Sequence, residues 1–129
     1  MTERELALRR EIFETFAATG APPDVEVDPA LEGLVEQHVV VLDRGGAGIH
    51  MAHPFAAHRD GTRVDADGRT WWGSCAWDGL GIVAALGLRE AAVVSNGIEL
   101  RVENGRVAGD AVFHVAVPAR DWWADIHFT

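Results

Sequence analysis

Apolar positions recur with helical spacing at the start of the chain, which predicts an amphipathic helix over residues 3–18. Gly20 and the Pro22-Pro23 pair that follow are expected to end this helix. A second helix is predicted to begin at Asp28-Pro29, because aspartate suits an N-cap and proline suits the first helical turn. The N-terminal part is therefore expected to be helical.

Short β-prone runs separated by turn residues follow these helices. Residues 39–42 and 49–53 flank a glycine-rich turn, and residues 62–72 are predicted to form a hairpin around Asp67-Gly68. Residues 75–86 instead have helical spacing, and Gly87 suits the C-cap of that helix. Further strands are predicted over residues 91–95, 98–102, 106–107, 111–117 and 126–128.

Together these elements predict an α+β fold. We expect a helical, winged-helix-like N-terminal part over residues 1–53 and an α+β core over residues 54–129. In the core, a mostly antiparallel sheet would pack on a central helix. A winged helix would point to DNA binding, whereas the alternative is an appendage that packs on the core. The net charge of −9 favours the appendage, so nucleic acid is not an expected partner.

The composition excludes several other functions. No apolar run approaches the ~18 residues of a membrane span. The charged N-terminus has no signal-peptide pattern, so we expect a cytoplasmic location without membrane association. All 11 basic residues are arginine, which excludes Schiff-base chemistry and a P-loop lysine. Cys75 is the single cysteine, which excludes an intrachain disulfide and a multi-cysteine zinc site.

Cys75 and Asp78 lie three residues apart at the start of the predicted central helix, on neighbouring parts of one face. The helix N-terminus favours negative charge, so the thiol pKa is expected to be lowered. An ionised Asp78 would oppose this effect, whereas a protonated Asp78 would act as a proton donor. Burial among Trp71, Trp72 and Trp77 would favour the protonated form. The structural alternative is a buried, inert cysteine beside a capping aspartate.

Histidines are the alternative partners for the thiol. His50, His53 and His58 precede it in the sequence, and further histidines follow on predicted late strands. Two or three imidazoles with Cys75 or Asp78 would suit zinc or copper, although their spacing matches no compact ligand motif. The alternative is that these histidines are exposed or hydrogen-bonded side chains. The metal set predicted here is Cys75, Asp78 and His127.

The most distinctive block of the sequence runs from Trp71 to Gly87. It has tryptophans before Cys75, Asp78 three residues later, and an apolar helix that ends in Leu86-Gly87. This block resembles the core of the organomercurial (alkylmercury) lyase family. Residues 51–55, 113–118 and 122–126 also look like segments of its shorter, actinobacterial-type members, and the N-terminal helices and hairpin are similar to the family's winged-helix-like part.

The resemblance implies protonolysis of a carbon–mercury bond, a detoxification reaction that requires no resident cofactor. Cys75 matches the thiol that binds the organomercurial, and Asp78 matches the acid that supplies the proton. Hg(II) would remain on thiolates as the product. The pocket for the apolar substrate is predicted to comprise Trp71, Trp72, Trp77 and His53. Each tryptophan pair, at 71–72 and 122–123, is expected to place one ring in the core and the other beside the substrate.

The family's second cysteine has no match in this sequence. The resemblance leads us to expect it at about Thr129, so we expect either a longer natural chain or a member without that thiol. A small-molecule thiol would then have to replace it. The alternative function is that of a non-lyase member, which uses Cys75 and Asp78 to bind a soft or borderline metal or to act on another small molecule.

Overall fold

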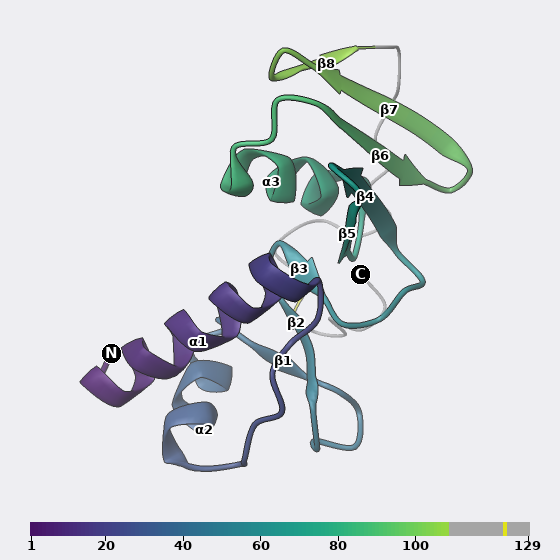
Figure 1. Cartoon of the computed structure of the whole chain (residues 1–129). Helices are drawn as coiled ribbons and strands as arrows, with labels where there is room; N and C mark the ends of the chain where they lie inside the picture. The colour runs from purple at the N-terminus through teal and green to yellow at the C-terminus, as the bar shows by residue number, and fades with distance from the viewer. Residues whose placement is uncertain (109–122, 124–129) are drawn as a thin grey trace.

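The computed structural model describes residues 1–108 and Trp123. The strands predicted over residues 111–117 and 126–128 lie outside the described residues. The N-terminal elements are α1 (Glu3–Thr19), α2 (Pro29–Glu36), β1 (Val41–Leu42), β2 (Ile49–Ala52) and β3 (Phe55–Ala56). They are followed by β4 (Thr62–Ala66), β5 (Arg69–Gly73), α3 (Ala76–Leu86), β6 (Ala91–Ser95), β7 (Ile98–Glu103) and β8 (Arg106–Ala108), as Figure 1 shows.

Local capping signals fix the ends of the first two helices. Thr2 and Glu5 form a capping box at the start of α1, and Gly20 ends the helix in the left-handed conformation, which glycine adopts readily. The Asp28 side chain accepts a hydrogen bond of 2.9 Å from the backbone N–H of Leu31 at the start of α2. The predicted second helix is therefore confirmed, with Asp28 as its N-cap.

The strands form two antiparallel sheets. The small sheet has the order β1-β2-β3, and the large sheet has the order β5-β4-β6-β7-β8. In Figure 1 the large sheet and α3 form the upper part of the molecule, and α1, α2 and the small sheet form the lower part. The predicted α+β class is confirmed. Strand β3 was not predicted, because two paired residues are too few to produce a visible periodicity.

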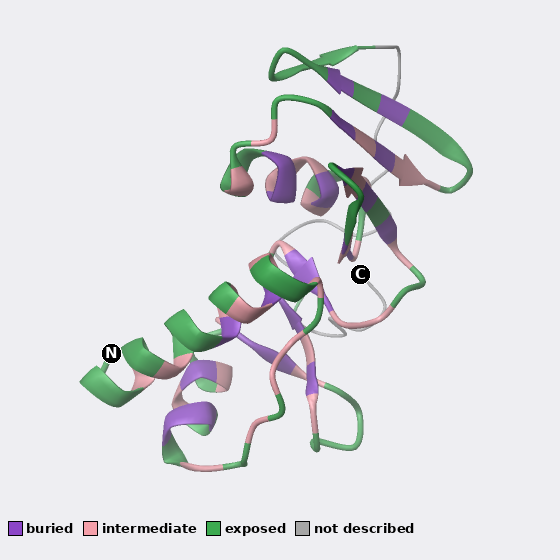
Figure 2. Cartoon of the chain, in the orientation of Figure 1, coloured by how far each residue is buried: buried purple, intermediate pink, exposed green. Residues whose placement is uncertain are grey.

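One face of the large sheet is buried against α3. Thr62, Val64 and Ala66 of β4 alternate with more exposed residues, as the banding in Figure 2 shows, and Val93 of β6 is fully buried. Gly79 brings α3 close to this face. A Cβ atom at Gly79 would lie 2.6 Å from Thr62 Cγ2 and 2.8 Å from Val93 Cγ1, well inside van der Waals contact. The close approach of helix and sheet therefore depends on glycine at this position.

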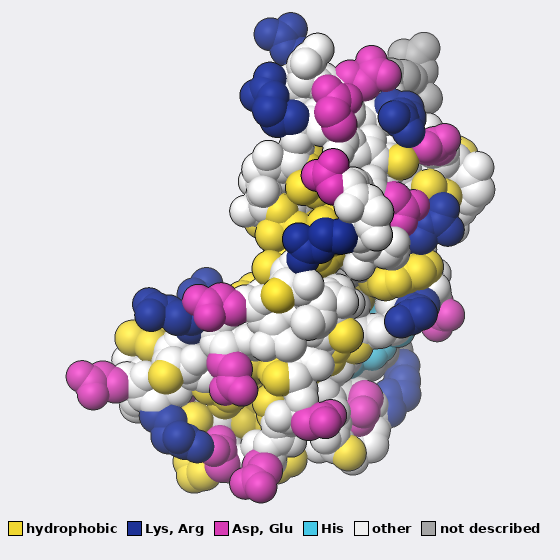
Figure 3. All heavy atoms as spheres, viewed as in Figure 1, with side chains coloured by type: hydrophobic (Ala, Val, Ile, Leu, Met, Phe, Trp, Pro, Cys, Tyr) yellow, Lys and Arg dark blue, Asp and Glu magenta, His cyan; other side chains and the backbone are white. Residues whose placement is uncertain are grey.

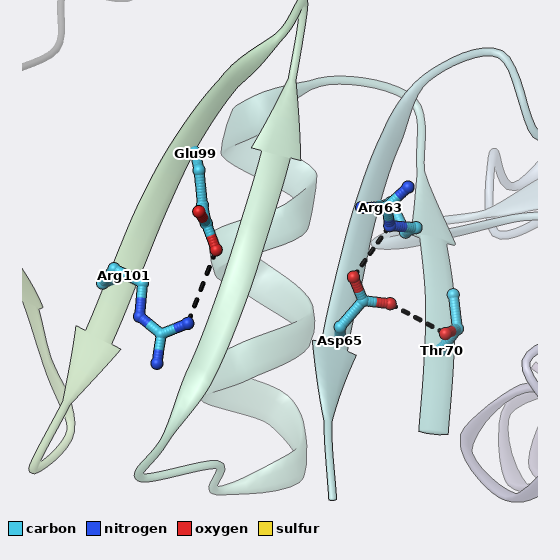
Figure 4. Close-up of polar contacts among 5 residues, drawn as sticks. All are labelled: Arg63, Asp65, Thr70, Glu99 and Arg101. Carbon is cyan, nitrogen blue, oxygen red and sulfur yellow. Dashed lines mark hydrogen bonds and ion pairs between the residues drawn. The ribbon is translucent and has the colours of Figure 1, made fainter. Parts of the chain in front are cut away.

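The opposite face of the large sheet carries polar and charged side chains. In Figure 4, Arg63 Nε lies 2.7 Å from Asp65 Oδ2, and the Thr70 hydroxyl donates a 2.8 Å hydrogen bond to Asp65 Oδ1. Helix α3 lies behind the strands in this view. Trp72 is the cross-strand partner of Arg63, and directly opposed residues point to the same side of a sheet. Trp72 therefore faces away from α3.

The C-terminal end of α1 is anchored on β5. The Trp71 indole N–H donates a 2.9 Å hydrogen bond to the Ala17 carbonyl, and Arg69 donates to the carbonyls of Ala17 and Ala18 at 2.9 and 2.7 Å. The Arg69 guanidinium also lies 4.9 Å from the centre of the Trp71 ring. These bonds satisfy carbonyls that a helix end leaves without partners. One hydrophobic cluster, which includes Phe16 of α1 and Trp71, joins the N-terminal elements to the sheet.

The surface of the described residues carries charges of both signs. On the face shown in Figure 3, acidic and basic side chains alternate over the helices and over the sheet. Within residues 1–108, no helix is long and apolar enough to cross a membrane.

Candidate active site at the start of helix α3

Cys75 and Asp78 lie at the start of α3. Cys75 is the N-cap, with extended backbone angles of φ −146° and ψ 172°, so the helix begins one residue later than predicted. Cys75 is exposed, and Asp78 lies in the first helical turn with 17% of its side chain exposed. The structure therefore brings the thiol and the acid together at one helix end.

The pKa of the Cys75 thiol is raised, chiefly because partial burial of the sulfur disfavours the thiolate. Backbone N–H groups of Asp78 and Trp77 favour the thiolate and lower the pKa, but their effect is smaller than that of burial. The Asp78 carboxylate adds to the rise through its negative charge and by accepting a hydrogen bond from the thiol. The predicted lowering of this pKa is therefore wrong, because burial and the neighbouring carboxylate outweigh the helix N-terminus.

His53 approaches the same carboxyl group from the turn between β2 and β3. Its Nδ1 atom lies 3.5 Å from Asp78 Oδ2, and 39% of its side chain is exposed. Gly73 at the end of β5 leaves room for this arrangement. A Cβ atom there would lie 3.0 Å from Asp78 Cβ and 3.1 Å from the Pro54 carbonyl oxygen. The Asp78 carboxyl group thus lies in the same helix start as Cys75 and contacts the His53 imidazole.

The tryptophans of the predicted pocket are spread over three environments. Trp71 is 2% exposed and contacts α1, Trp72 lies on the sheet face away from α3, and Trp77 is 69% exposed. The structure therefore does not bring these three rings together around Asp78. The predicted strand alternation is confirmed for the first pair, because Trp71 and Trp72 lie on opposite faces of β5, but the outward ring of Trp72 lies on the sheet face away from α3.

A different tryptophan, Trp123, lies near His53. The Trp123 ring is 6.3 Å from the His53 ring at an interplanar angle of 81°, and it stacks on the His38 ring at 3.9 Å. The tryptophan pair at residues 122–123 was the available sequence signal for this contact, whereas nothing in the local sequence pointed to His38. Trp122 lies outside the described residues.

The remaining histidines form a separate group. The His50 and His58 rings stack with centroids 4.6 Å apart, and His58 Nε2 lies 3.3 Å from Ser74 Oγ. Among the described residues, no three His, Cys, Asp or Glu side chains are placed to hold a metal ion. His114 and His127 lie outside the described residues, so the predicted set of Cys75, Asp78 and His127 stays a prediction.

The family comparison matches the part of the chain that holds Cys75 and Asp78. The family model described as MerB, alkylmercury lyase, matches residues 55–129, which is more than half of the chain. The chain belongs to the alkylmercury lyase family. The match includes β3, α3 and the whole large sheet, so it contains Cys75, Asp78 and Gly73.

A solved structure of this family shares the fold. The structure, "Crystal structure of the mercury-bound form of MerB2", superimposes with a TM-score of 0.63 at 19% sequence identity. The alignment covers 84% of this chain and 60% of the MerB2 chain, so the present chain spans well under the full length of MerB2. No curated protein matches the sequence.

Proposed function

We propose that this alkylmercury lyase family member captures organomercurials on Cys75 and cleaves their carbon–mercury bond with a proton from Asp78. The observation that supports it is the placement of one thiol and one carboxyl group three residues apart at the start of α3, inside the matched family region. Mercury prefers thiolate ligands because both are soft, and a carboxylic acid within reach of the bound carbon can supply the proton.

Capture begins with the Cys75 thiolate. The thiol proton passes to the Asp78 carboxylate as the thiolate forms, the sulfur attacks mercury in R–Hg–X, a sulfur–mercury bond forms, and X leaves as an anion. The raised thiol pKa makes the thiolate a minor species at neutral pH, so capture is expected to become faster as the pH rises.

Cleavage then requires a second thiolate and the Asp78 proton. A small-molecule thiolate binds mercury beside Cys75 and raises the electron density on the carbon. The carbon–mercury bond breaks, its electron pair takes the proton from the Asp78 carboxyl group, and the hydrocarbon R–H leaves. Hg(II) stays bound to two sulfurs and Asp78 becomes a carboxylate, so atoms and charges balance. The proposal takes this second thiolate from a small-molecule thiol, since Cys75 is the one cysteine of this sequence.

We place the apolar group of the substrate beside His53 and Trp77. Both side chains are exposed. Trp77 belongs to the first turn of α3, and His53 belongs to the turn that contacts Asp78. Of the other predicted pocket residues, Trp71 is buried against α1, and Trp72 lies on the face of the large sheet that points away from α3. The exposed pair is therefore the better candidate for substrate contact.

The test is release of benzene from phenylmercury in the presence of excess small-molecule thiol. The wild-type protein should release benzene catalytically, and Cys75→Ser should release none above the thiol-only background. The serine variant is a suitable control because it differs by one atom at an exposed position. Circular dichroism would verify that both proteins are folded.

Two outcomes would contradict the proposal. Equal benzene release from the wild type and from Cys75→Ser would show that Cys75 takes no part. Retention of phenylmercury by the wild type without any benzene would indicate soft-metal binding alone, which is the alternative function.

A further inference from the structure

We infer that His53 is a positioning residue that holds the Asp78 carboxyl group beside Cys75. This inference rests on the proposed function, because it assigns a task within the same site. The geometric basis is the contact of His53 Nδ1 with Asp78 Oδ2 at 3.5 Å, on the carboxyl group that lies three residues after Cys75 at the start of α3.

The base of the Asp78 side chain is fixed by packing. Gly73 is so close that an added Cβ atom would lie 3.0 Å from Asp78 Cβ, and Gly79, the next helical residue, packs on Thr62. The Asp78 Cβ atom therefore has little freedom, and rotation of the side chain decides where its oxygens point. A contact to one of the oxygens is what restricts that rotation.

His53 is itself well held, as a positioning residue must be. It lies in the turn between β2 and β3, which pair as Met51 with Ala56 and Ala52 with Phe55. All four of these paired residues are buried. On its other side the His53 ring contacts Trp123 edge to face, and Trp123 stacks on His38. The imidazole thus joins the small sheet to the carboxyl group on α3.

The position of the acid matters for proton transfer. The proton donor must lie within hydrogen-bond reach of the carbon that Cys75 holds through mercury. A misplacement of about 1 Å in such a geometry can lower a rate by about 100-fold. Loss of the His53 contact is therefore expected to lower kcat by roughly 10- to 100-fold, without affecting capture by Cys75.

The experiment compares His53→Ala with His53→Asn in the full chain. Asparagine can place its amide nitrogen near the position of Nδ1, so it keeps a hydrogen-bond donor for Asp78. We would measure kcat and KM for benzene release, stoichiometric capture of phenylmercury, and the χ1 rotamer of Asp78 from NMR scalar couplings. His58→Asn is the matched histidine control, because His58 contacts Ser74 Oγ instead.

The expected result in His53→Ala is a lowered kcat, an averaged Asp78 rotamer and unchanged stoichiometric capture, with a raised KM because the imidazole also lies beside the substrate. His53→Asn should restore a single Asp78 rotamer and most of kcat, and His58→Asn should resemble the wild type. A single, wild-type Asp78 rotamer in His53→Ala would overturn the inference, whatever the activity. If the wild type releases no benzene, the proposed function fails, and the rotamer measurement still decides whether His53 positions Asp78.

Discussion

The contact between α1 and β5 and the start of α3 lie a few residues apart in the chain but are built differently. At the first, Trp71 and Arg69 donate three hydrogen bonds of 2.7–2.9 Å to the carbonyls at the end of α1, and the Trp71 ring is buried. At the second, the thiol of Cys75 is exposed and the Asp78 carboxyl group meets His53 at 3.5 Å.

This difference separates stability from chemistry. Buried aromatic area and satisfied carbonyls stabilise the fold at the α1–β5 contact. The start of α3 contributes little buried area, and its polar groups remain within reach of a ligand. Substitutions in the first region should therefore change the free energy of unfolding, whereas substitutions in the second should change reactivity.

The largest expected effect on stability is that of Trp71→Ala. Loss of a buried tryptophan, together with its bond to the Ala17 carbonyl, should lower the free energy of unfolding by about 3–5 kcal/mol. The matched control is Trp77→Ala, which removes an exposed ring and should change it by less than about 0.5 kcal/mol. Urea unfolding measures both, and equal losses would remove the distinction between the two regions.

A smaller loss is expected for Gly79→Ala on the buried face of α3. The new methyl group would clash with Thr62 and Val93, at a cost of about 1–3 kcal/mol. Alanine's better helix propensity returns up to about 1 kcal/mol. Gly81→Ala is the control, because its nearest contact would be Pro54 Cβ at 3.2 Å. Thermal unfolding should show Gly79→Ala as the less stable variant, and the reverse order would contradict the packing described.

The pH dependence of Cys75 should show the smallest effect. Because burial and Asp78 raise its pKa, alkylation by iodoacetamide should reach half its maximal rate above the ~8.5 of free cysteine. Asp78→Asn removes the charge, so its midpoint should fall. The folded protein holds the thiol proton more tightly than the unfolded chain does, so stability should decrease as the pH rises above that value. A midpoint below that of free cysteine would contradict this description.

The features that sequence predicts well are those fixed by neighbouring residues. Asp28-Pro29 begins α2, Asp67-Gly68 turns between β4 and β5, and Gly87 ends α3, since caps and turns depend on local backbone chemistry. The place of Cys75 and Asp78 at one helix end follows from the same local rules.

Features that depend on distant segments could not be predicted. His53 and Asp78 are 25 residues apart, and their contact depends on β3, which is too short to be seen in the sequence. Strand alternation predicts that Trp71 and Trp72 face opposite ways, but not which of them contacts α1. The Cys75 pKa is raised by burial of the sulfur and lowered by the backbone N–H groups of the helix N-terminus. Which of these two effects is larger can be decided only from the folded structure.

The most direct test of the account is mass spectrometry of Asp78→Asn after a single turnover with phenylmercury and excess thiol. Because the asparagine variant keeps Cys75 and lacks the proton donor, we expect it to accumulate an intact phenylmercury adduct on Cys75. The wild type should instead release benzene and retain Hg(II). Release of benzene by Asp78→Asn at the wild-type rate would contradict the assignment of Asp78 as the acid.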